Sequence, residues 1–211
     1  MREDNLIVRP RKKRRKAKGV SANSCVRRRA EHVNHVWTYD FVKHKTADGS
    51  DYRILNIVDE FSRYSMPPLV ARSIGAEAVI EHLAKLMPIY GSPGLLRSDN
   101  GPEFVAEAVQ RWLASISVGT AYIQPGSPWE NAYVESFNDK MRDELLNSEL
   151  FFTLKEADTV IQDWIEHYNT DRPHSGVGGR TPAAARAALQ GSPRSSHALG
   201  VPEGLHAQAL S

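Results

Sequence analysis

The chain has 211 residues, of which 41% are hydrophobic and 25% are charged, proportions ordinary for a globular protein with one buried core. No stretch approaches the roughly 18 to 20 consecutive apolar residues of a membrane-spanning helix, and the N-terminus lacks the apolar segment of a signal peptide. We therefore expect a cytoplasmic protein without a membrane partner. Cys25 is the single cysteine, which excludes an internal disulfide. A zinc site on Cys25, His32 and His35 would need further ligands from elsewhere.

The net charge of +2 conceals a strong asymmetry. Residues 1–30 hold 12 of the 27 Lys and Arg and 2 of the 25 Asp and Glu, which leaves 15 basic and 23 acidic residues, a formal charge of −8, in residues 31–211. A basic arm ahead of an acidic domain suggests that the arm contacts a polyanion, although a solvated, disordered tail has the same composition. We predict a disordered arm over residues 1–32, a folded core over 33–182 and a poorly ordered tail over 183–211.

The first part of the core has the pattern of β-strands. Residues 36–42 alternate apolar and polar side chains, and the turn residues 48–50 separate them from a second β-like run over 52–58, which predicts a hairpin. A third run over 64–71 contains Pro67 and Pro68, which cannot donate ladder hydrogen bonds, so we place it at the edge of the sheet.

Helices and strands then alternate. Helical spacing predicts helices over residues 75–90 and 104–116, and short strands are expected over 95–97 and 120–123. This order favours a mixed sheet flanked by helices, an α/β fold. A capping box over 127–130 predicts a helix that continues to about residue 146, and another amphipathic helix is expected over 154–168. After Pro182 the composition predicts at most an Ala-rich turn.

Three carboxylates stand in ordered elements: Asp40 within the first strand, Asp99 at the end of the fourth, and Glu135 in the capped helix. Aspartate is disfavoured in strands, and a residue that breaks a local rule is a candidate for function. Converging carboxylates repel one another unless a cation neutralises them, and magnesium or manganese takes such oxygen ligands. From spacing alone, each carboxylate could equally be solvated separately or paired with an arginine.

Five sequence blocks carry a family resemblance. They are WTYD (37–40), DEFSR (59–63), SDNGPEF (98–104), PGSPWENAYVESF (125–137), and YN (168–169) leading to RPH (172–174). With these blocks in order, and 35 residues between Asp99 and Glu135, the chain resembles the integrase-core DDE transposases of bacterial insertion sequences. The resemblance is specifically to the second-reading-frame product of the insertion-sequence-three family.

This resemblance implies an RNase H-like fold similar to the retroviral integrase catalytic core, with five strands in the order 3-2-1-4-5. It implies that Asp40, Asp99 and Glu135 are catalytic and hold Mg²⁺, with Mn²⁺ as a substitute, at two ions. The implied substrate is DNA at the ends of the element and at the target, cleaved by metal-activated water and then joined by strand transfer. The implied partners are further copies of the chain and a helix-turn-helix product of the upstream frame, acting at the bacterial nucleoid.

Several basic residues are candidates for DNA contacts. Arg142 lies two helical turns after Glu135 and shares its face, although a local pair with Asp139 or Glu149 would explain it equally. The other candidates are Lys12, Lys13, Arg14, Arg15 and Arg172. We expect Asp59 to pair with Arg63, and the Trp side chains at 112 and 164 to belong to the core.

Other functions remain open at this level. A truncated product could bind DNA or the full-length enzyme and act as a non-catalytic regulator. A retroviral-type integrase is disfavoured because the chain lacks a His-His-Cys-Cys zinc module, and an RNA-degrading RNase H would not share the five blocks.

Overall fold

The computed structural model of the chain describes residues 29–98, 107–122 and 132–190. The expected arm, with Lys12, Lys13, Arg14 and Arg15, lies outside these residues. So do Asp99 and the capping box over 127–130. Within the described part of the chain, no helix is long and apolar enough to cross a membrane.

Five strands form one mixed sheet. They are β1 (Val36–Lys45), β2 (Asp51–Asp59), β3 (Leu69–Ala71), β4 (Leu95–Ser98) and β5 (Gly119–Tyr122). Their order is β3-β2-β1-β4-β5, with β1, β2 and β3 antiparallel and β4 and β5 parallel to β1. This is the predicted order, and β3 lies at the edge. The strand is shorter than predicted because it begins only after Pro67 and Pro68.

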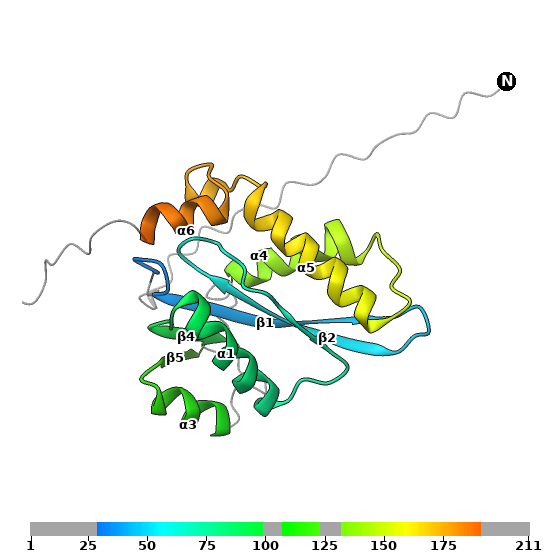
Figure 1. Ribbon diagram of the computed structural model, residues 1–211, viewed down its shortest axis with the longest axis horizontal. Coiled ribbons are helices and arrows are strands. Elements are labelled where there is room, and N and C mark those ends of the chain that lie inside the picture. Colours follow the sequence, from blue (N-terminus) through cyan, green and yellow to red (C-terminus); the bar gives the residue numbers. More distant parts are fainter. Residues whose placement is uncertain (1–28, 99–106, 123–131, 191–211) are drawn as a thin grey trace, which may run out of the picture.

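Helices cover both faces of this sheet (Figure 1). They are α1 (Ala76–Tyr90), α3 (Glu107–Ser115), α4 (Ala132–Met141) with its π-helical continuation η2 (Arg142–Leu146), α5 (Leu154–Thr170), the short 3₁₀ helix η3 (Ser175–Val177) and α6 (Pro182–Gln190). In Figure 1, α1 and α3 lie on one side of the sheet, and α4 and α5 lie on the other.

Strand β1 explains why there are two cores. Its side chains alternate between the faces, so Trp37 and Tyr39 pack with α1 and α3 in one hydrophobic cluster, while Val42 packs with α4 and α5 in a second. Asp40 precedes Val42 by two residues and therefore faces the α4 side. The only strongly polar position in the middle of β1 thus points toward one particular helix.

Three local features differ from the predictions. Helical spacing would place Ile89 with Val79, Leu83 and Leu86 on the buried side of α1, but Ile89 is 73% exposed, because the helix is close to its end there and the core lies under Leu86 and Met87. The helix after α4 changes to π-helix at Arg142 rather than remaining α-helical. A second capping box, between Thr153 and Glu156, starts α5.

Residues 183–190 are helical, whereas the sequence predicted a poorly ordered tail. Helix α6 is anchored by Arg186, which is only 6% exposed although it is charged. Its guanidinium lies 3.7 Å from the carboxylate of Asp59 and donates a 3.0 Å hydrogen bond to Oδ1 of Asn34. The prediction failed because composition reports average hydrophobicity, whereas this helix is fixed by one buried ion pair.

Candidate active site

Asp40 occupies the middle of β1 and is half-buried. Its Oδ1 accepts a 2.7 Å hydrogen bond from the backbone N–H of Phe41, and its Oδ2 accepts a 2.9 Å hydrogen bond from Nδ2 of Asn138. Each carboxylate oxygen therefore accepts a hydrogen bond from the protein. These two donors restrain the orientation of the carboxylate.

Asn138 is itself held by a second asparagine. Asn56, which lies directly opposite Asp40 in the antiparallel pairing of β1 and β2, donates a 2.8 Å hydrogen bond from Nδ2 to Oδ1 of Asn138. The same Nδ2 also lies 3.6 Å from Sδ of Met141. Both asparagines are buried, at 0% and 2% exposure. A relay of amides therefore fixes the carboxylate of Asp40 to both β2 and α4.

Glu135 lies one helical turn before Asn138 on α4. Positions three apart in a helix are neighbours on its surface, about 4.5 Å apart along the axis, so the contact between Asn138 and Asp40 brings the turn that carries Glu135 next to β1. Glu135 is exposed, whereas Val134, Phe137 and Met141 bury the opposite side of the helix. A carboxylate in this position is available to a ligand that approaches from solvent.

Arg142 follows on the same face of α4, seven residues after Glu135. Its guanidinium lies 4.0 Å from the carboxylate of Asp139, an exposed pair that stabilises little. It also lies close to His44 of β1, whose pKa is lowered first by burial and then by the charge of Arg142. Because His44 has the same orientation in β1 as Asp40, a stripe of polar side chains runs along this side of the sheet.

Asp99 lies outside the described residues, but the strand before it is well defined. Strand β4 pairs in parallel with β1, with Thr38 opposite Arg97, and ends at Ser98. Arg97 forms a 2.6 Å ion pair with Glu60, and both side chains are buried. This pair fixes the end of β4 to the turn after β2.

Among the described residues, no cluster of three or more His, Cys, Asp and Glu side chains has the geometry of a metal site. The oxygen donors that are described, Asp40 and Glu135, are the hard ligands that Mg²⁺ and Mn²⁺ prefer. The fixed orientation of the Asp40 carboxylate and the exposure of Glu135 fit such an ion. His32 and His35, from the zinc alternative, stack on each other with ring centroids 4.8 Å apart.

One expected pair, Asp59 with Arg63, is different in the structure. The side chain of Asp59 caps the turn after β2, accepting hydrogen bonds from the backbone N–H groups of Phe61 and Ser62, and its charge partner is Arg186. Arg63 instead lies 3.5 Å from the ring centroid of Tyr133 in a cation–π contact. The two residues are joined by a 2.9 Å hydrogen bond from the backbone N–H of Arg63 to the carbonyl oxygen of Asp59, whereas their side chains have the other partners just named.

The other candidates are placed as follows. Arg172 forms a bidentate ion pair with Glu144 of η2. Trp112 and Trp164 are partly buried and pack against the first and second clusters, as expected of core residues. Asn56 and Asn138 were missed, although Asn56 interrupts an apolar run in β2 just as Asp40 interrupts β1.

Comparisons with known proteins agree with this architecture. Two family models, both described as "Integrase core domain", match residues 30–128 and 116–182. An uncharacterised 39.2 kDa protein of insertion element IS476 from Xanthomonas euvesicatoria is 37% identical over 92% of this chain and 56% of its own length. An uncharacterised 31.7 kDa protein of insertion element IS407 from Burkholderia multivorans is 37% identical over 86% of this chain and 65% of its own length. The transposase for insertion sequence element IS904 from Lactococcus lactis is 32% identical over 71% of this chain and 60% of its own length.

Solved structures show the same fold. A chain from the structure of the simian T-cell lymphotropic virus intasome in complex with PP2A regulatory subunit B56 gamma superposes with a TM-score of 0.61 at 21% identity, covering 87% of this chain and 63% of that chain. The HTLV-2 integrase catalytic core domain, in complex with magnesium, has a TM-score of 0.58 at 20% identity, covering 75% of this chain and 99% of that chain. The predicted RNase H-like, integrase-like fold is thereby confirmed. The chain spans little more than half to about two thirds of the length of the insertion-element relatives. Its two integrase-core matches, which together span residues 30–182, show that it belongs to the integrase-core family.

Proposed function

We propose that the chain is the catalytic part of a transposase that cuts DNA at the ends of an insertion sequence and joins them to a target, using Asp40, Asp99 and Glu135. The observation that carries the proposal is the contact between Asn138 and Asp40, which brings the helix of Glu135 against the strand of Asp40. Asp99 follows Ser98 directly in the sequence, and Ser98 ends the strand that pairs with β1. The relatives in insertion elements support the same reaction.

The side chains suit metal-dependent phosphoryl transfer. A pair of Mg²⁺ ions, or Mn²⁺ in their place, would activate the attacking oxygen and neutralise charge on the leaving oxygen. Asp40, oriented by the amide relay, and Glu135, exposed on α4, supply anionic oxygens, and Asp99 is proposed as the third. Arg142 has the position to hold a DNA phosphate beside them, and Arg172, Lys12, Lys13, Arg14 and Arg15 are proposed as further DNA contacts.

The proposed partners are the two ends of the element, target DNA, and further copies of the chain, since two DNA ends must be handled together. The HTLV-2 integrase core was solved in dimeric and trimeric forms, which supports an oligomer. A helix-turn-helix product of an upstream reading frame would supply recognition of the ends. The site of action would be the bacterial nucleoid.

The test is cleavage and strand transfer on labelled duplexes that carry the ends of the element, with Mg²⁺, Mn²⁺ or a chelator. Asp40→Asn, Asp99→Asn and Glu135→Gln should each lower product formation by at least about 100-fold, because each removes a proposed metal ligand. Asp51→Asn is the matched control, since Asp51 is exposed and paired only with Lys45 at 3.6 Å. Products that persist in the triad variants would refute the proposal. DNA binding without any product in the unaltered chain would support the regulatory alternative.

A further inference from the structure

Helix α4 has a second polar face, turned away from Glu135. Tyr133, Ser136 and Lys140 share this face, whereas Glu135, Asn138 and Arg142 share the other. The face of Lys140 borders a pocket of about 380 Å³ closed by the turn after β2 and by the segment that follows α5. Its lining includes Arg63, Tyr133, Lys140, Tyr168, Arg172 and His174.

Three cations converge on this pocket. Arg63 lies over the ring of Tyr133, with 3.5 Å between its Cζ and the ring centroid, and Lys140 and Arg172 line the same pocket. Their charges act together on His174, whose pKa is lowered to about 4, first by burial and then by Lys140, Arg172 and Arg63. Burial and this positive charge together disfavour the protonated imidazole, and the same cluster of positive charge favours an anion in the pocket.

One carboxylate opposes these cations. Glu144 of η2 is paired with Arg172, and the charge and hydrogen bonds of this arginine lower the pKa of Glu144. Both side chains are about one-third exposed. The pair is therefore partly solvated, and Arg172 can exchange Glu144 for another anion at modest cost.

A buried ring nitrogen of His174 is a second, independent indication that the pocket binds a ligand. Its side chain is buried, with 8% of the residue exposed, and its Nε2 has no hydrogen-bond partner. A buried polar atom without a partner is uncommon and costs stability, so it calls for an explanation. An anionic oxygen in the pocket would provide one, since its charge would favour the protonated imidazole, in which Nε2 donates.

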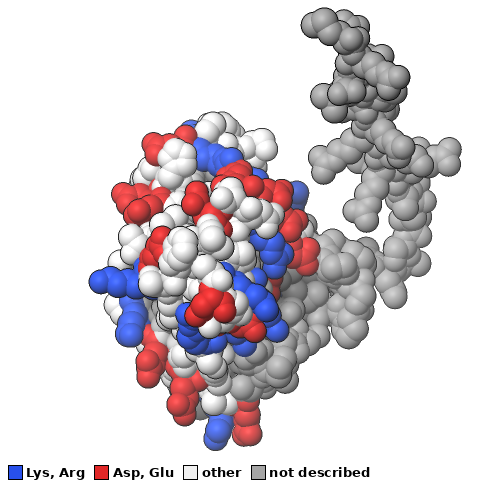
Figure 2. Space-filling view, turned by 90° about the vertical axis from the view of Figure 1, so that its right-hand side faces the viewer, with Lys and Arg blue, Asp and Glu red and all other residues white. Residues whose placement is uncertain are grey.

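The position of the pocket indicates what the anion is. A second cavity, of about 490 Å³, shares Arg63, Tyr133 and Gly176 with the first and continues it to Arg29 and Arg180. Arg29 is preceded directly in the sequence by residues 1–28, which contain 11 Lys and Arg. The two cavities are lined by the cations Arg29, Arg63, Lys140, Arg172 and Arg180 and by one carboxylate, Glu60, so a polyanion that contacts Arg29 meets further positive charge there. Figure 2 shows a face with a different charge distribution, on which acidic and basic side chains are interspersed over the described surface.

We infer that the pocket between Arg63, Lys140, Arg172 and His174 binds a backbone phosphate of DNA, on the face of α4 opposite the cleavage site. This inference rests on the proposed function, because it takes DNA as the substrate. It assigns α4 two roles, with one face for the reacting phosphate and the other for a phosphate elsewhere on the bound DNA. Arginine, lysine and tyrosine side chains are usual ligands of DNA phosphates.

The first test measures duplex binding by the 211-residue chain in chelator, at several salt concentrations. Lys140→Gln should weaken binding about 5- to 10-fold and reduce the slope of log affinity against log salt by about 0.9, the value of one phosphate contact. Lys140→Arg should retain the slope. Glu144→Gln should tighten binding severalfold, because it releases Arg172. Lys155→Gln, an exposed lysine at the far end of α5, is the matched control and should change nothing.

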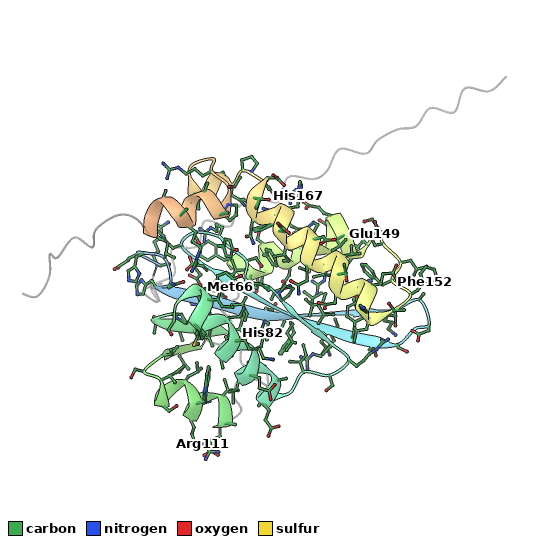
Figure 3. All side chains as sticks on the ribbon, in the orientation of Figure 1. Met66, His82, Arg111, Glu149, Phe152 and His167 are labelled. Atoms are coloured by element: carbon green, nitrogen blue, oxygen red, sulfur yellow. The ribbon has the colours of Figure 1, made fainter. Side chains whose placement is uncertain are left out.

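The second test follows imidazole titrations by NMR. On adding duplex, the titration midpoint of His174 should rise by more than about one unit, because a phosphate beside Nε2 favours protonation. His82, whose Nε2 lies 3.0 Å from the carbonyl oxygen of Pro67, sits between α1 and the sheet (Figure 3) and should not respond. The charged and titratable groups around His174 are Lys140 of α4, Glu144 of η2, Tyr168 of α5, Arg172 and Arg63.

The inference is overturned if Lys140→Gln behaves like Lys155→Gln and the midpoint of His174 does not move. It is also overturned if poly-glutamate, but not duplex DNA, shifts that midpoint, since the occupant would then be an acidic protein segment. In either case, metal-dependent cleavage that is lost in Asp40→Asn would leave the proposed function intact. Loss of cleavage alone does not affect the binding test, which is made without metal.

Discussion

Asn138 of α4 donates a hydrogen bond of 2.9 Å to Oδ2 of Asp40 in β1, across a sequence separation of 98 residues. This bond joins the helix of one proposed metal ligand to the strand of another. Because Asn138 is fixed in turn by Asn56, neither the helix nor the carboxylate can shift without breaking a buried polar contact. The geometry of the site therefore depends on two residues that are not expected to touch the substrate.

Asn138→Ala should separate positioning from stability. It removes a donor to Asp40 and leaves Nδ2 of Asn56 without its oxygen acceptor, so we expect about 1–3 kcal/mol of destabilisation and a 10- to 100-fold rise in the Mg²⁺ concentration needed for cleavage. The measurement is a Mg²⁺ titration of cleavage rate. Asn169→Ala is the control, because Asn169 is also buried and makes two hydrogen bonds, to the backbone of Ser65. If both variants need the same Mg²⁺ concentration as the unaltered chain, Asn138 does not position the metal ligand.

Arg142→Gln should reduce DNA affinity without unfolding the chain. Arg142 is about half exposed and its pair with Asp139, at 4.0 Å, contributes little to stability. We expect a 3- to 10-fold loss of duplex affinity at low salt and a loss of less than about 0.5 kcal/mol in stability, measured by fluorescence anisotropy and urea unfolding. Arg111→Gln on α3, which removes a comparable exposed pair with Glu107, should leave affinity unchanged. Equal losses in the two variants would argue against a specific contact at Arg142.

Arg186→Leu should lower the free energy of unfolding by about 3 kcal/mol or more. The substitution leaves the carboxylate of Asp59, which is fully buried, without its cation. Urea unfolding of this variant should be compared with that of Arg180→Leu, because Arg180 is exposed and its loss should cost less than about 0.5 kcal/mol. A cost for Arg186→Leu as small as that of Arg180→Leu would show that α6 is not anchored by the ion pair.

The lowered pKa of His174 predicts that the free energy of unfolding decreases in mild acid. Its pKa is lowered from 6.5 to about 4 in the folded chain, so between these values the unfolded chain binds a proton that the folded chain does not. The free energy of unfolding should therefore have its full value above pH 6.5 and fall as the pH decreases to 4, by up to about 3 kcal/mol.

Urea unfolding from pH 4 to pH 7 measures this loss. His174→Gln should flatten the slope, and His167→Gln, which changes an exposed histidine, should retain it. If His174→Gln has the same slope as the unaltered chain, the acid sensitivity originates elsewhere.

Much of the fold follows from local patterns in the sequence. The alternation around Asp40 and the turn residues before β2 predict the central hairpin, and Pro67 and Pro68 predict an edge position for the third strand. The spacing of Val79 and Leu83 predicts α1. These features depend on neighbours within a few residues, which is why periodicity and turn chemistry detect them.

The features that were missed depend on distant partners. The burial of Arg186 is decided by Asp59 and Asn34, 127 and 152 positions earlier in the chain, and no local pattern reports such a pair. The amide relay is similar, although the pairing of Asp40 with Asn56 offered a signal, since both are polar residues inside strands. In the site, sequence blocks could name Asp40 and Glu135 but could not identify the hydrogen bonds that orient them.

The anchoring of α6 has a consequence for the order in which the protein can be made. Translation proceeds from the N-terminus, so Asp59 and Asn34 leave the ribosome long before Arg186 has been synthesised. Until then, the turn after β2 must bury a carboxylate that lacks its counter-ion, or remain open to water. A nascent chain that stops before residue 186 therefore cannot close its fold with the native charge balance, and completion of the domain is coupled to the synthesis of α6.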